Sequence, residues 1–308
     1  MRVITEDTEC GCYRPPSAKK LLACYRTSSL PTGADAKAAH AQLAKIQRDM
    51  IRTRRLLMVD GQRRLTEFLK GYFDARINNF CDRVMAHLHI AVEIAKTSGS
   101  WDRKDTAIDT ITLEANSEVW RSALVAALGT TADAELIAAY TPIVQSIAAR
   151  AYERTSTFIG EELAVDRSFT ILRRAQSMAE EVTSINETTR ARLVDTLEQA
   201  LAEKQTVAEA VRTIRETIPE IEAGRIPTIA RTEIGNAIDA GTKQALLESS
   251  TVKTVMVIGC QAREARSPQY NGQSTCNIRG VPVRDVDKLR FHPNHTGCIV
   301  PETFIGEG

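Results

Sequence analysis

Five cysteine and histidine residues gather near the end of the chain at spacings that suit a metal ion. They are Cys260, Cys276, His292, His295 and Cys298. Two widely separated ligands followed by a close pair are typical of tetrahedral zinc, which thiolate and imidazole groups hold. A small loop-rich segment has too little apolar surface to stay closed by itself, so a structural zinc ion would stabilise its fold. We therefore predict a zinc site that uses four of these five residues.

The ligand set itself stays open at this point. The favoured set is Cys260, Cys276, His292 and His295, with Cys298 as a substitute ligand or a bystander. The alternative is that the cysteines are reduced and pack in a small core while the histidines hydrogen-bond in loops, since no Cys-x-x-Cys pair is present.

Enzymatic interpretations of the same segment are weaker. The string from His292 to His295, His-Pro-Asn-His, has the residue types of a His-Asn-His nuclease, but such sites draw them from a hairpin and a helix far apart in sequence. A zinc hydrolase needs an open metal position and a nearby general base. The one candidate base, Glu264, lies between Arg263 and Arg266 and is typical of a solvated charged loop. We expect no catalytic residue and no enzymatic activity; a zinc-dependent nuclease or toxin-like hydrolase is the alternative.

The composition is that of a globular protein that stays in the cytosol. Its 308 residues correspond to about two domains, and 43% hydrophobic and 26% charged residues are ordinary values. No run approaches the ~20 apolar residues of a membrane span, and the N-terminus lacks the pattern of a secretory signal. Thiols are then expected to stay reduced, and Cys10, Cys12 and Cys24 are interpreted as free.

Charge is distributed unevenly along the chain. Residues 1–100 hold 17 Lys and Arg against 10 Asp and Glu, a net charge of +7, whereas residues 101–308 hold 23 against 29. A basic segment can mark contact with nucleic acid or with an acidic protein, and charge spread over helix surfaces is the ordinary alternative. We expect weak, salt-sensitive DNA binding by this first third.

The elements that must carry these residues are mostly helical. Apolar residues recur at helical spacing from Ala36 to Leu57 and again from Leu65 to Val92, which predicts two long helices packed on each other, the second ending at Ser98. Further amphipathic runs follow around 108–128 and 136–158.

Local signals become sharper after residue 183. Ser184 with Glu187, and Thr206 with Glu209, have the spacing of capping boxes and predict two short helices. The second is expected to stop before Pro219, and Pro227 to open a third helix that ends near residue 248. The β-branched residues that follow Ser250 predict short strands.

Three segments in this order resemble the phage Mu F-like minor head protein family. They are Ile185–Thr189, which opens a helix pair; Ile229–Glu233, with its Ala-Arg-Thr-Glu string; and the Cys/His tail that ends in His292-Pro293-Asn294-His295. The resemblance covers roughly residues 180–301. In many relatives a close cysteine pair precedes the final string, whereas Cys260 and Cys276 are sixteen residues apart here, which leaves the ligand set open.

The resemblance implies a low-copy protein, also called a head morphogenesis or minor capsid protein. It would lie in the interior of the phage head, after assembly in the host cytoplasm, and act in DNA packaging or ejection. Its expected partners are the portal protein, the scaffold or major capsid protein, and packaged DNA, with no membrane. Arg231, Thr232 and Glu233 are the motif residues to follow.

We therefore predict a mostly α fold, in which an elongated helical body carries a small C-terminal α+β Cys/His module of zinc-knuckle type. Four segments are expected. Residues 1–34 form an irregular arm, 35–180 a long-helix body, 181–250 a helical Mu F-like core, and 251–308 the short-strand Cys/His module.

Overall fold

Two compact units make up the chain, and each is built from segments far apart in sequence. The computed structural model describes residues 34–97, 117–160, 185–200, 202–259, 278–289, 291, 295 and 297–304. Unit 1 comprises Met1–Gln62, Val144–Ala175 and Arg231–Gly308; unit 2 comprises Arg63–Ile143 and Gln176–Ala230. The four-segment division predicted from the sequence stays a prediction.

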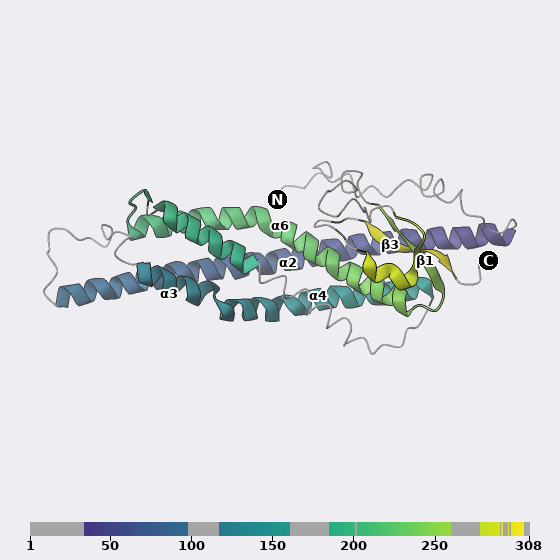
Figure 1. Ribbon diagram of the computed structural model, residues 1–308, viewed down its shortest axis with the longest axis horizontal. Coiled ribbons are helices and arrows are strands. Elements are labelled where there is room, and N and C mark those ends of the chain that lie inside the picture. Colours follow the sequence, from purple (N-terminus) through teal and green to yellow (C-terminus); the bar gives the residue numbers. More distant parts are fainter. Residues whose placement is uncertain are drawn as a thin grey trace. The chain divides into compact units, whose positions relative to one another are not determined.

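Helices dominate the described residues, which confirms the mostly α part of the predicted fold (Figure 1). They are α2 (Ala34–Thr97), α3 (Ser117–Leu128), α4 (Thr130–Ile159), a helix over residues 185–200, and α6 (Val207–Glu248). The predicted irregular arm lies outside the described residues.

Helix α2 is continuous, so the prediction of two helices packed on each other was wrong. Its 64 residues run through Gly61, where a break between the two periodic runs was expected. A glycine costs a helix about 1 kcal/mol relative to alanine. The reason for it lies in packing, because a Cβ atom at Gly61 would lie 2.7 Å from Cγ2 of Ile234 on α6. The glycine allows α6 to approach α2 closely.

Helix α6 is likewise continuous, although it contains Pro219 and Pro227. The sequence prediction placed a helix end and a helix start there, because an interior proline removes one amide donor and costs about 3 kcal/mol. Buried residues instead keep a four-residue spacing across both prolines, at Ile214, Ile218, Glu222, Ile226, Ala230 and Ile234. Each buried isoleucine contributes about 1.5–3 kcal/mol, so this face outweighs the two prolines.

The start of α6 agrees with the predicted capping box. The Thr206 hydroxyl accepts a hydrogen bond from the Glu209 amide at 3.2 Å, and the Thr206 amide donates to the Glu209 carboxylate at 2.8 Å. These reciprocal bonds satisfy two amides that a helix start leaves without partners. The matching residue Ser184 lies outside the described residues.

The core of unit 2 uses the apolar face predicted for the second half of α2. Every fourth or third residue of that face is buried, namely Leu65, Leu69, Phe73, Ile77, Phe80 and Val84. Phe80 packs against Trp120 of α3, with ring centroids 5.9 Å apart. The periodicity therefore identified the buried face correctly.

Unit 1 carries a three-stranded antiparallel sheet, which confirms that short strands follow the helices. Strands β1 (Val252–Ile258), β2 (Val281–Pro282) and β3 (Cys298–Phe304) lie in the order β2-β1-β3, and a 3-10 helix, η6 (Val283–Lys288), follows β2. Val257 of β1 pairs with Ile299 of β3.

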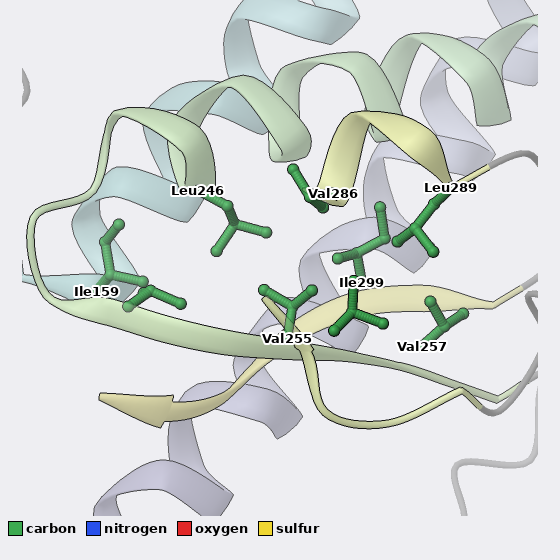
Figure 2. Packing of buried hydrophobic residues seen from close by; sticks show 9 residues of the cluster. Ile159, Leu246, Val255, Val257, Val286, Leu289 and Ile299 are labelled. Carbon is green, nitrogen blue, oxygen red and sulfur yellow. The ribbon is translucent and has the colours of Figure 1, made fainter. Parts of the chain in front are cut away.

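Both faces of this sheet are covered. Val255, Val257 and Ile299 point into a cluster with Leu246 of α6 and Val286 of η6, as Figure 2 shows. Their neighbours in sequence, Met256, Cys298 and Val300, point to the opposite face. There they form a second cluster with Met50 of α2. Because side chains alternate along a strand, one short sheet joins helices on its two sides.

One helical stretch, Ser122–Ile159, is long and apolar enough by composition to cross a membrane. Its most apolar window has a mean hydropathy of 1.3, and 29% of that window is buried. The sequence prediction passed over it because it contains no uninterrupted apolar run. Core helices of globular proteins meet the same criterion, and this stretch buries Leu136 and Tyr140 within unit 2 and Ile147 and Tyr152 within unit 1.

Candidate functional site

A buried ion pair in unit 1 marks the most polar part of its core. The guanidinium of Arg54 on α2 donates to Asp239 on α6 at 2.5 Å and 3.3 Å, and each side chain is only 7% exposed. Burial raises the pKa of the Asp239 carboxyl, but Arg54 and the neighbouring His295 outweigh that effect, so its pKa lies below the usual value. Asp239 is therefore a carboxylate held in a low-dielectric setting.

His295 is the one histidine of the predicted zinc set that the structure describes. Its Nδ1 lies 3.8 Å from Oδ2 of Asp239, and its ring stacks on Phe291 with centroids 3.9 Å apart. Its backbone passes close to α6, since a Cβ atom at Gly235 would lie 3.8 Å from the His295 carbonyl oxygen. The His-Pro-Asn-His string thus ends against α6.

Lys243, one turn after Asp239 on α6, contacts residues that precede His295 in sequence. Its buried ammonium donates to the Leu289 carbonyl at 2.7 Å and lies 5.0 Å from the centre of the Phe291 ring. A cation over an aromatic face is attracted by the ring quadrupole. Two side chains of α6, Asp239 and Lys243, therefore lie against three described residues, Leu289, Phe291 and His295.

Cys298 begins β3 and lies near the ion pair. Its thiol is buried, and this burial raises its pKa to about 12, so it stays protonated at neutral pH. It lines a small cavity together with Arg54, Thr155 and Thr242, with room for about one water molecule at most. Its described surroundings are those of a core thiol.

The predicted zinc set is only partly described. Cys260, Cys276 and His292 lie outside the described residues, and His295 and Cys298 lie within them. No three His, Cys, Asp or Glu side chains gather as metal ligands among the residues that the structure describes. This finding does not bear on a site that needs at least two of the other three residues.

The chemistry of the two described residues can still be compared with what zinc requires. A metal-binding histidine usually has its second ring nitrogen directed at a carboxylate, and Asp239 takes that place beside Nδ1 of His295. The Nε2 atom then fits a metal ligand. Cys298 would first have to lose its proton in an apolar setting, which only a nearby cation would compensate. His295 therefore fits a zinc site more readily than Cys298 does.

The motif residues Arg231, Thr232 and Glu233 lie on α6, half-buried, roughly two turns before Asp239. Directly after them, Ile234 makes the close approach to Gly61 of α2. The motif thus immediately precedes the part of α6 that contacts α2 and the His295 loop.

The first segment of the family resemblance lies in unit 2 and forms a buried polar network. Asn186 is fully buried and donates to Asp133 at 2.7 Å and to the Tyr72 hydroxyl at 3.1 Å. Thr189, also buried, donates to Glu222 at 3.2 Å. These bonds hold the helix over residues 185–200 against α2, α4 and α6.

Glu222 itself is nearly inaccessible to solvent, and two arginines compensate the negative charge of its carboxylate. Arg225 lies 3.3 Å and Arg192 3.6 Å from its Oε1. A buried carboxylate is tolerated when it is paired and hydrogen-bonded in this way. The arrangement stabilises unit 2 and offers no exposed reactive group.

Sequence reasoning missed Arg54 and Asp239, the residues that organise the site around His295. A signal was present for Arg54, because it continues the buried face of α2 four residues after Met50 and three before Leu57. A charged residue in an apolar face needs a buried partner. Nothing in the sequence named Asp239 as that partner, because 185 residues separate the two.

Comparison of the chain with protein-family models, with curated proteins and with solved structures found no match.

Proposed function

We propose that this protein is a bacteriophage minor head protein that binds the portal and acts in head morphogenesis and in DNA packaging or ejection. The proposal rests on the motif segments and on how two of them lie. The helix that carries Arg231, Thr232 and Glu233 also holds the last histidine of the His-Pro-Asn-His string, through Asp239 and His295. Motif segments that pack within one unit support their belonging to one functional element.

The proposal includes one structural zinc ion per chain. It would be held by four of five residues, Cys260, Cys276, His292, His295 and Cys298. The ion would supply folding energy by closing the segment from Cys260 to Cys298. Asp239 would orient the imidazole of His295, and Lys243 would hold the loop that precedes it.

Elemental analysis of protein purified without chelators tests the zinc proposal. We expect about one zinc per chain, and His295→Ala should release it and unfold the C-terminal segment while the helices persist. Cys81→Ser is the matched control, since Cys81 is a buried thiol of unit 2 outside the ligand set. Metal-free protein, together with a His295→Ala variant that melts like the parent, would show that these residues are merely loop and core.

Co-purification tests the assembly function. When the full chain is co-expressed with the tagged portal protein encoded in the same genome, the portal should retain it. Particles made without the chain should package DNA poorly, and mass spectrometry should find the chain in mature particles. A portal that assembles without retaining the chain, with mature particles that lack it, would contradict the proposal.

The hydrolase alternative has less support. A zinc hydrolase needs a carboxylate beside an open metal position. The candidate base Glu264 lies outside the described residues, and the carboxylate that lies beside His295, Asp239, is already paired with Arg54. A carboxylate whose pKa is lowered by a buried guanidinium is a weak base.

A further inference from the structure

Helix α2 presents a row of basic side chains on the face opposite its buried residues. The row consists of Lys37, Lys45, Arg48, Arg52 and Arg55, all of which are exposed. At about 100° of rotation per residue, these five positions fall within a sector of roughly 80°. We call this row the α2 basic face. It belongs wholly to unit 1.

The charges of the α2 basic face have no ionic partner within the part of the chain that the structure describes. Some basic residues of α2 outside this row do have partners, since Arg54 pairs with Asp239 and Arg63 with Glu67. One acidic residue, Asp49, borders the row and is half-buried. Several like charges on one helical face repel one another, so a bound anion would be favourable.

We propose that the α2 basic face binds the phosphate backbone of double-stranded DNA, without regard to sequence. From Lys37 to Arg55 the helix rises by roughly 27 Å. DNA carries one negative charge per about 1.7 Å of its axis, counting both strands, so a row of cations of this length lies in a strongly negative potential and can contact several phosphates where it runs beside a backbone. Three of the five cations are arginines, whose guanidinium groups suit phosphate oxygens.

The composition of the face favours phosphate contact over base recognition. Between Lys37 and Arg55, the one other position in the same sector is the exposed Ala41, so the sector contains no Asn or Gln, the side chains that most often read adenine. Leu56 and Val59, which are 62% and 63% exposed, continue the same side of α2 beyond the last arginine. These two side chains would serve an amphipathic acidic protein better than DNA, and they give the test a way to separate the two partners.

Binding of the full chain to a mixed-sequence duplex of roughly 30 base pairs, followed by fluorescence anisotropy, tests the proposal. Contacts with four or five phosphates predict a log–log salt slope of about −4, so affinity should fall on the order of 10²-fold from about 50 to 200 mM salt. A duplex of unrelated sequence should compete equally.

The decisive variant removes four of the charges, as Lys45→Gln, Arg48→Gln, Arg52→Gln and Arg55→Gln. Glutamine is a good helix former, so the helix should persist, as circular dichroism would verify. The salt slope should lose about three to four units. The control makes the same change in net charge at exposed residues elsewhere, with Lys204→Gln, Arg212→Gln, Lys253→Gln and Arg284→Gln. It should change affinity by less than about threefold.

Two further variants separate the effect of charge from that of the guanidinium group and of the neighbouring apolar side chains. A charge-preserving variant with Arg48→Lys, Arg52→Lys and Arg55→Lys should keep the salt slope, and Leu56→Ser with Val59→Ser should bind DNA like the parent. The proposal is overturned if the control weakens binding as much as the four-charge variant, or if the apolar pair proves essential for DNA binding. It is also overturned if the chain fails to bind the duplex at low salt, including the case in which it binds an acidic peptide instead. Portal binding is measured separately, so failure here is distinguishable from failure of the assembly function.

Discussion

Replacing Arg54 by methionine should destabilise unit 1 by about 3–5 kcal/mol at neutral pH. The substitution leaves the Asp239 carboxylate buried without the guanidinium that lies 2.5 Å from it. Methionine fills much of the space of the arginine stem, so the loss reports the charge rather than a cavity. Domains are stable by about 5–15 kcal/mol, so this is a large share of the total.

The pH dependence of the loss follows from the pKa of Asp239. In the native chain this pKa is lowered, so the carboxylate contributes stability above the unfolded-state pKa, and this contribution disappears as the pH falls through the folded-state pKa. Without Arg54, burial dominates and raises the pKa of Asp239. In acid, protonation of Asp239 removes the buried unpaired charge of the variant. The difference in free energy of unfolding between the native chain and Arg54→Met should therefore be largest near pH 7 and shrink toward pH 4.

Hydrogen exchange of peptides from β1 and β3 measures this loss in unit 1, and urea unfolding followed by circular dichroism measures it for the whole chain. Arg52→Met is the matched control, because Arg52 is exposed on the same helix, and it should change stability by less than about 0.5 kcal/mol. Adding Asp239→Leu to Arg54→Met should recover much of the loss, since no buried charge then remains.

A loss below about 1 kcal/mol, as for an exposed pair, would refute the reasoning. So would a loss that stays constant from neutral pH to pH 4, because the Asp239 carboxylate would then not be the group left without compensation.

Three further predictions concern packing, thiols and catalysis. Gly241→Ala should lower the free energy of unfolding by at least about 1–3 kcal/mol, because its Cβ atom would lie 2.1 Å from a backbone carbonyl oxygen of α4. Gly71→Ala should instead raise it by about 0.5–1 kcal/mol, because nothing lies within 4 Å of the added Cβ atom. The urea midpoints of both variants measure these changes. Burial raises the pKa of Cys81 to about 11 and that of Cys298 to about 12. Mass spectrometry should therefore find that iodoacetamide at pH 8 alkylates neither thiol in the folded protein and both thiols in urea. Rapid alkylation of the folded protein would contradict their burial. Purified protein should not cleave DNA with magnesium, manganese or zinc, and cleavage that disappears in His295→Ala would restore the nuclease alternative.

The parts of the fold that local sequence determines could be predicted. The capping box at Thr206, the strand after Ser250 and the buried face from Leu65 to Val84 all follow from neighbouring residues alone. Such features depend on hydrogen bonds and periodicities that span a few residues.

The joins between elements could not be predicted, because tertiary contacts decide them. Gly61 suggests a break until Ile234 is known to lie against it, and Pro219 and Pro227 suggest helix ends until the buried face that crosses them is known. Propensity is a weak prior where packing contributes several kcal/mol. The site could likewise be predicted only in part. The spacing of the Cys and His residues pointed to His295, whereas no local pattern pointed to its partner Asp239.

The sheet of unit 1 imposes an order on biosynthesis. Met50 of α2 is buried by Met256, Cys298 and Val300, and Gln47 donates to the Pro301 carbonyl across 254 positions of sequence. At translation rates of about 5–20 residues per second, the first half of α2 leaves the ribosome roughly 12–50 seconds before β3 does. During that interval its apolar face has no strand to cover it. Nascent chains that stop before residue 298 would keep that face uncovered, which makes them substrates for chaperones and proteases rather than shorter working copies.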